Sequence, residues 1–250
     1  MVAKLVKIIF VFSLLFYLFH FLFFWMFEST DSYFYFAFAQ FIRTGTYFIP
    51  SPYQYAVPST MEPPLYSVIL FLTQFFHRSD VLIHFLQIAA IVVSAFFLYR
   101  IFLEHIGKTF ALFFATLFLI VPGHFVYVSN LVAEPIAIFF ISLYLFVLYR
   151  YIEKKEQHLL GFLLILSAFM TLQRYNLIGF FGVSLLLFFR LKKKSKNTYF
   201  GFLGGIAILF SWVLINHFLN SSWGFSNSEG KHLYNRILHF DRLLPAQDDP

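Results

Sequence analysis

The sequence has no cysteine and few charged residues, which make up only 12% of its 250 residues. The lack of cysteine excludes disulfides, thiolate metal sites and a cysteine nucleophile, and it leaves the redox compartment open. A typical soluble domain carries roughly 25% charged residues. Because 60% of the residues are hydrophobic, the chain has too little polar surface to cover a core in water. These proportions predict an all-α integral membrane protein.

Sequence motifs for nucleotide binding and for hydrolysis are also absent. We find no glycine-rich phosphate loop, dinucleotide fingerprint, nucleophile elbow or His-Glu-x-x-His sequence. A soluble nucleotide donor is therefore not expected. The net charge of +6 would suit nucleic acid only if it formed a basic face on a soluble fold. Membrane lipids, and not nucleic acid, are the expected surroundings.

Seven apolar runs are predicted to cross the membrane as helices. An eighth run, Leu65–Phe76, is shorter than the roughly 20 residues that a crossing needs. We interpret this run as a helix lying at the membrane surface. The seven predicted spans are Ile8–Phe27, Val81–Tyr99, Phe110–Val128, Pro135–Tyr149, Leu159–Leu172, Leu177–Phe189 and Phe200–Phe218.

The distribution of basic residues supports this choice. If the eighth run crossed, the connections 150–158 and 190–197 would carry eight Lys and Arg residues on the outside. That would contradict the excess of Lys and Arg found in cytoplasmic loops. We therefore expect a multi-pass plasma or inner membrane protein with a cytoplasmic N-terminus. A transmembrane domain would cover 1–218 with an extracytoplasmic loop at 28–80, and 219–250 would form a second loop or the start of a C-terminal part.

Asp31 and Tyr35 lie in a stretch through Thr44 without Gly or Pro, which predicts a second helix along the membrane surface. Asp31 has two interpretations. It is an N-cap that accepts a backbone hydrogen bond, or it is a carboxylate held at the membrane surface as a general base. Tyr35 follows four residues later, on the same helical face.

Four further polar residues are predicted on the same outer side. Glu62 precedes Pro63-Pro64, where it either binds substrate or simply favours a helix start. Glu134 stands at the mouth of the fourth span, where it is either a functional group or an interfacial residue that reaches water. Arg174, at the tip of a short helical hairpin, suits a phosphate. His124 is either a ligand or proton carrier, or a simple interfacial hydrogen bonder.

Five short segments together carry a resemblance to a known group of proteins. In this order they resemble GT-C-type membrane glycosyltransferases, which include protein O-mannosyltransferase-like enzymes and the aminoarabinose transferases of lipid A. The segments are Asp31-Ser32 with Tyr35, Ala39 and Gly45-Thr46-Tyr47; Pro63-Pro64-Leu65-Tyr66; Ala133-Glu134-Pro135; Leu172-Gln173-Arg174; and Gly224 to Tyr234.

The resemblance implies an inverting transfer of a sugar from a polyprenyl-phosphate donor to a glycan, lipid or protein acceptor on the extracytoplasmic face. It implies about seven transmembrane helices with two juxtamembrane helices in the first loop. Asp31 and Glu134 match the catalytic carboxylates and Arg174 a donor-phosphate contact. Tyr35, Glu62 and His124 are expected to contribute to substrate binding. No nucleotide is implied, and a divalent cation stays open.

The sequence also departs from that group. Ser32 stands where the group often has a second acid, which weakens the case for a metal, and Glu62-Pro63-Pro64 lacks the lysine of the lipid A enzymes. The end of the chain at Pro250 reads like the middle of a loop, so a fragment is one interpretation. The alternatives are a non-catalytic lipid-carrier translocase, an accessory membrane subunit and an inactive truncated member of the group.

Overall fold

The computed structural model describes residues 2–47 and 62–226, apart from the side chains of Val2 and Thr30. The middle of the predicted first loop (28–80) lies outside the described residues. Most of the predicted C-terminal segment (219–250), and of the segment Gly224 to Tyr234, also lies outside them.

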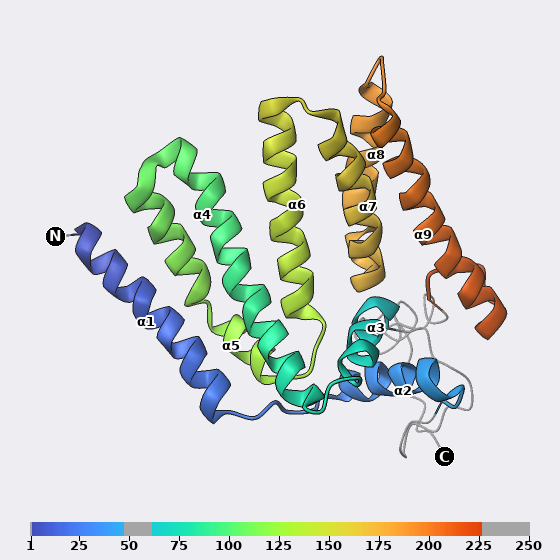
Figure 1. The fold of residues 1–250 in the computed structure, drawn as a ribbon, viewed down its shortest axis with the longest axis horizontal. Helices are drawn as coiled ribbons and strands as arrows, with labels where there is room; N and C mark the ends of the chain where they lie inside the picture. Colours follow the sequence, from blue (N-terminus) through green and yellow to red (C-terminus); the bar gives the residue numbers. More distant parts are fainter. Residues whose placement is uncertain (1, 48–61, 227–250) are drawn as a thin grey trace, which may run out of the picture.

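The described residues fold into nine α-helices and one 3₁₀-helix (Figure 1). One isolated parallel β-bridge joins Phe27 to Asn130. The Phe27 N–H donates to the Ser129 carbonyl, and the Leu131 N–H donates to the Phe27 carbonyl. The elements in chain order are α1 (Val2–Phe23), α2 (Thr30–Thr44), α3 (Pro64–Thr73), α4 (Ser79–Leu119), α5 (Pro122–Ser129), α6 (Glu134–Lys154), α7 (Gln157–Gln173), η1 (Tyr175–Leu177), α8 (Ile178–Arg190) and α9 (Lys196–Asn220).

Within the described ranges, four helices are long and apolar enough to cross a membrane: α1, α4, α6 and α9. Helices α3, α7 and the Tyr175–Arg190 segment are apolar but shorter. The all-α membrane class predicted from composition is thus confirmed. The number of crossings and the surface position of α2 and α3 stay predictions.

Helix α4 contains the predicted span Val81–Tyr99 and the first part of the predicted span Phe110–Val128, and the chain reverses direction between them. Gly107 has φ 77° and ψ 166°, a conformation that a residue with a Cβ rarely adopts. Figure 1 shows the two arms of α4 running in opposite directions on either side of this reversal. The glycine therefore provides the turn between the runs that begin at Val81 and Phe110.

The predicted continuous helix Phe110–Val128 is wrong, because it is divided at Pro122. Helix α4 ends at Leu119, Val121 is extended, and Pro122 begins α5. Proline has no N–H to donate and its ring collides with the preceding turn, so it starts a helix more readily than it continues one. The predicted run Ile8–Phe27 is also too long, since α1 ends at Phe23.

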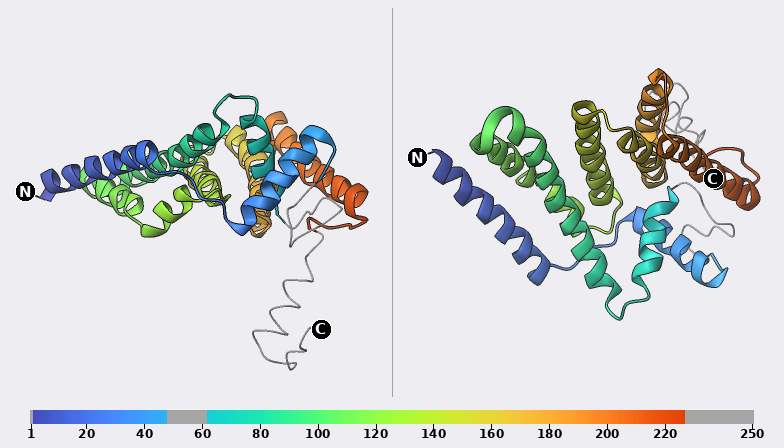
Figure 2. Two further views of the ribbon diagram at one scale, coloured as in Figure 1. Left: turned by 90° about the horizontal axis from the view of Figure 1, so that it is seen from below. Right: turned by 45° about the horizontal axis from the view of Figure 1, so that its top comes forward.

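The helices lie side by side, and their two ends differ in character (Figures 1 and 2). At one end lie α2, α3, α5 and the first residues of α4 and α6. At the other end lie the reversal within α4 and the connections from α6 to α7 and from α8 to α9. The last of these connections contains Lys192, Lys193 and Lys194. The basic connections therefore lie at the end of the bundle opposite α2 and α3.

Glycines allow α7 and α9 to pack closely. A Cβ added at Gly161 in α7 would lie 2.5 Å from the backbone oxygen of Asn197, and one added at Gly201 in α9 would meet the backbone of Gly161. Gly204, three residues later, has different surroundings. A Cβ there would come no closer than 3.6 Å to Ile165, which is ordinary contact.

We expect Gly201→Ala to destabilise the protein by about 1–3 kcal/mol, because the added methyl forces two backbones apart. Gly204→Ala is the matched control on the same helix. It is expected to be neutral or to stabilise by about 0.5–1 kcal/mol, since alanine favours the helix. Thermal unfolding of the two variants in detergent measures the difference. Equal effects at the two positions would show that α7 and α9 do not approach this closely.

Candidate active site

Asp31 lies in the first turn of α2, but it does not cap the helix. The N-cap is Ser29, whose backbone N–H donates to the Ser32 hydroxyl at 2.8 Å. The Ser29 and Ser32 hydroxyl oxygens are 3.0 Å apart. The N-cap interpretation of Asp31 is therefore wrong, because two serines already satisfy the helix start. The Asp31 side chain is exposed and available to another partner.

The segment of residues 130–133, which joins α5 to α6, lies at the base of the site. Three buried side chains from three different helices donate hydrogen bonds to its backbone carbonyls. Ser32 of α2 donates to Leu131 at 2.7 Å, Gln87 of α4 to Asn130 at 3.1 Å and to Val132 at 2.9 Å, and Gln173 of α7 to Ala133 at 3.0 Å. This segment, which we call the carbonyl strip, fixes the position of Glu134, the next residue.

Glu134 and Arg174 form an ion pair with a direct hydrogen bond. Glu134 begins α6, and Arg174 follows α7, one residue after the Gln173 that binds the carbonyl strip. Burial lowers the pKa of the Arg174 guanidinium, but the hydrogen bond and charge of Glu134 more than offset this, and the net pKa is raised. Arg174 therefore stays charged, and its side chain is still 41% exposed.

Glu62 is held above this pair by two tyrosines. The Tyr35 hydroxyl donates to Glu62 Oε2 at 3.0 Å, and the Tyr175 hydroxyl donates to the Glu62 backbone oxygen at 3.4 Å. The Tyr35 ring also packs edge-on against the ring of Tyr66, with centroids 4.8 Å apart. Burial raises the pKa of Glu62, and the charge of Asp31 raises it further.

The raised pKa of Glu62 predicts a pH dependence. A carboxyl whose folded-state pKa lies above its ordinary value of 4.5 is penalised when it ionises in the folded protein. The protonated carboxyl contributes its full stability to the folded protein below that ordinary value. This contribution is lost as the pH rises through the folded-state pKa and the carboxyl ionises. Glu62→Gln should therefore be more stable than the unaltered protein at about pH 7, and the difference should shrink towards about pH 4. Thermal unfolding across this range tests the expectation, and a difference independent of pH would contradict it.

Asp31 is close enough to these groups to interact electrostatically. Its charge contributes to the raised pKa of both Glu62 and Tyr35, and the charge of Glu134 contributes to both as well. Arg174 acts on Glu62 in the opposite direction. Three carboxylates and one guanidinium, from α2, the start of α3, α6 and the end of α7, thus share one local environment.

Five of the six predicted site residues lie together: Asp31, Tyr35, Glu62, Glu134 and Arg174. His124 is buried in α5, where its ring packs against Phe118 with centroids 4.4 Å apart. No hydrogen bond or ion pair between described residues joins His124 to the carboxylates. Its predicted substrate contact therefore gains no support from the geometry.

Sequence reasoning missed Ser32, Gln87, Gln173 and Tyr175 as contributors to the site. Gln87 was visible as a rare polar residue inside an apolar run, and a buried amide needs a hydrogen-bond partner. Nothing in the sequence shows that the partners are carbonyls more than 40 residues away. Among residues 2–47 and 62–226, no group of three or more His, Asp or Glu side chains could hold a metal ion.

Comparison with known families now bears on this arrangement. The family model described as dolichyl-phosphate-mannose-protein mannosyltransferase matches residues 61–217, more than half of the chain. The chain belongs to this family. Membership in the mannosyltransferase family confirms the resemblance found in the sequence and indicates a membrane glycosyltransferase that uses a polyprenyl-phosphate sugar donor. The match includes Glu62, Glu134 and Arg174, whereas Asp31 and Tyr35 precede it. No curated protein and no solved structure matches the chain.

Proposed function

We propose that the protein transfers a sugar from a polyprenyl-phosphate donor to an acceptor hydroxyl on the extracytoplasmic face, with inversion at the anomeric carbon. The observation that carries this proposal is the convergence of Asp31, Glu62, Glu134 and Arg174 from four separated segments at one end of the bundle. The acceptor would belong to a glycan, a lipid or a protein. The carboxylates supply a base, and the guanidinium supplies a phosphate contact.

Asp31 is the proposed general base. Its exposed carboxylate takes the proton from the acceptor hydroxyl as the hydroxyl oxygen forms a bond to the anomeric carbon. The bond between that carbon and the donor phosphate oxygen breaks at the same time, and the phosphate leaves with the electron pair. Attack from the face opposite the phosphate inverts the configuration. The exposure of Asp31 supports this role, because a base must reach a substrate that enters from outside.

Arg174 is the proposed contact for the departing phosphate. A guanidinium has five N–H donors, so the hydrogen bond to Glu134 leaves others free for phosphate oxygens. Electrostatic stabilisation of a leaving group depends on a donor that is already in position. We propose that Glu134 acts chiefly by holding Arg174, which makes it a positioning residue and not a second base.

Glu62 and Tyr35 are proposed to shape the region between Asp31 and Arg174. Burial, and then the charge of Asp31, raises the pKa of the Glu62 carboxyl. Tyr35 keeps the carboxyl oriented through its hydrogen bond.

Transfer of a labelled sugar from a synthetic polyprenyl-phosphate donor by the reconstituted protein tests the proposal. We expect transfer without any added nucleotide, and product analysis should show the inverted anomer. Assays with glycan, lipid and peptide acceptors would identify the acceptor class. Retention of configuration, or lipid scrambling without sugar transfer, would contradict the proposed function.

A further inference from the structure

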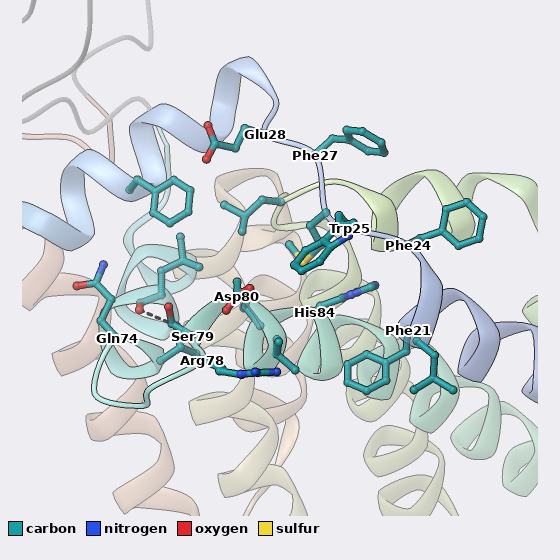
Figure 3. A pocket seen from close by; sticks show the side chains of 18 of the residues that line it. Phe21, Phe24, Trp25, Phe27, Glu28, Gln74, Arg78, Ser79, Asp80 and His84 are labelled. Atoms are coloured by element: carbon teal, nitrogen blue, oxygen red, sulfur yellow. Dashed lines mark hydrogen bonds between the residues drawn. The ribbon is translucent and has the colours of Figure 1, made fainter.

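A hollow lies where the end of α1 approaches α3 and α4, and Leu131 of the carbonyl strip forms part of its lining. Its volume is about 420 Å³, within the roughly 300–1,000 Å³ typical of small-molecule sites. One wall is the continuous stretch 21–28, and the opposite wall is formed by the end of α3 and the start of α4 (Figure 3). Phe36 and Leu70 line this hollow, whereas Tyr35 and Tyr66 pack together near Glu62.

The rim of the hollow is strongly apolar and exposed. Phe24, Trp25 and Phe27 on the first wall are 49%, 77% and 63% exposed. Phe75 and Phe76, which follow the lining residue Gln74 but do not line the hollow themselves, are 74% and 62% exposed. Phenylalanine is favourable in contact with lipid chains, and tryptophan is enriched at the boundary between lipid and water. The rim is therefore suited to lipid chains beside the hollow.

The lining of the hollow carries charges of both signs, on side chains that are exposed to solvent. Arg78 and Asp80 lie at the start of α4, and Glu28 lies on the other wall, across from Arg78 (Figure 3). Among residues 2–47 and 62–226, none of the three forms an ion pair within 4.0 Å. One guanidinium and two carboxylates thus face a common space without neutralising one another directly.

This charge pattern fits a zwitterionic headgroup. A guanidinium matches a phosphate through paired N–H donors, and the two carboxylates can accept hydrogen bonds from a primary ammonium. An anionic headgroup would meet the guanidinium but be repelled by two carboxylates. A metal cation would meet the carboxylates but be repelled by Arg78. A quaternary ammonium has no N–H to donate.

We propose that the hollow binds an aminophospholipid such as phosphatidylethanolamine. Its phosphate lies against Arg78, its ammonium lies between Glu28 and Asp80, and its acyl chains follow the exposed aromatic rim. The bound lipid joins the end of α1 to the turn between α3 and α4. This role is independent of sugar transfer and of the residues proposed to carry it.

Native mass spectrometry of the purified full chain, delipidated in detergent and titrated with single lipids, tests the proposal. Phosphatidylethanolamine is expected to bind about tenfold or more tightly than phosphatidylcholine or phosphatidylglycerol. Arg78→Gln should lower its affinity about tenfold or more, and Arg78→Lys should lower it less. Asp80→Asn combined with Glu28→Gln should remove the preference for the primary ammonium.

Lys192→Gln, at the opposite end of the bundle, is the matched control and should leave phosphatidylethanolamine binding unchanged. Thermal unfolding confirms that each variant is folded before it is titrated. Equal or tighter binding of phosphatidylglycerol by the unaltered protein would overturn the proposal, as would unchanged phosphatidylethanolamine affinity in Arg78→Gln. Soluble glycerophosphoethanolamine binding as tightly as the lipid would overturn the role of the apolar rim.

Discussion

Replacing Asp31 with asparagine is expected to lower kcat for sugar transfer by about 10²–10⁴-fold. The amide keeps the size of the carboxylate but cannot take a proton from the acceptor hydroxyl. Because Asp31 is exposed and the helix start is capped by Ser29 and Ser32, folding should be unaffected. Donor-saturated transfer rates, measured beside thermal unfolding, separate loss of catalysis from loss of structure.

Glu104→Gln is a matched carboxylate-to-amide control. Glu104 is exposed within α4, between its start and the reversal at Gly107, and it accepts a hydrogen bond from Tyr149 of α6. The change there should leave kcat within about twofold, since it touches no proposed substrate contact. Undiminished transfer in Asp31→Asn would exclude Asp31 as the base and direct attention to Glu62.

The Arg174→Gln change is expected to lower kcat by about 10²–10³-fold, the usual effect of losing one donor to a developing negative charge. Arg174→Lys should retain part of the activity, because it keeps the charge but loses the planar fork. Donor analogues that lack the sugar should also bind less tightly to Arg174→Gln. Steady-state kinetics and binding of polyprenyl phosphate provide the two measurements.

A double-mutant cycle then tests the proposed role of Glu134. If Glu134 acts only by holding Arg174, then Glu134→Gln together with Arg174→Gln should be no worse than Arg174→Gln alone. Losses that multiply would instead show that Glu134 contacts the substrate independently. Thermal unfolding of the same variants should show that each single change lowers stability, because it leaves one charge of the pair without its partner.

The sequence allowed the helical class and the grouping of Asp31, Glu62, Glu134 and Arg174 to be predicted, for different physical reasons. Apolar length is a local property, so helices could be recognised one at a time. The grouping followed from counting basic residues in the connections. That count assigns each loop to a side, and it needs no knowledge of packing.

Other features depended on contacts that a single sequence does not reveal. Hydropathy separates the two runs on either side of Gly107, but it joins Phe110–Val128 into one run that the structure divides before Pro122. Asp31 is a residue type that often caps helices. The sequence does not show that α2 begins at Thr30, with Ser29 as the N-cap and a hydrogen bond from Ser29 to Ser32. His124 is a polar residue beside the Pro122-Gly123 break, and the sequence does not show that its ring is buried against Phe118 where α4 meets α5.

The carbonyl strip separates two kinds of residue at the base of the site, those that donate hydrogen bonds and those that accept them. Its hydrogen bonds are accepted by main-chain oxygens of residues 130–133, which every amino acid possesses, while the donors are the specific side chains of Ser32, Gln87 and Gln173. The hydrogen bonds themselves therefore do not depend on the side chains of the receiving residues, of which Leu131 and Ala133 are buried in the core. The position of Glu134 relative to Arg174 depends on donor side chains in α2, α4 and α7. A library of substitutions should therefore show larger losses of transfer activity at Ser32, Gln87 and Gln173 than at the residues whose carbonyls accept.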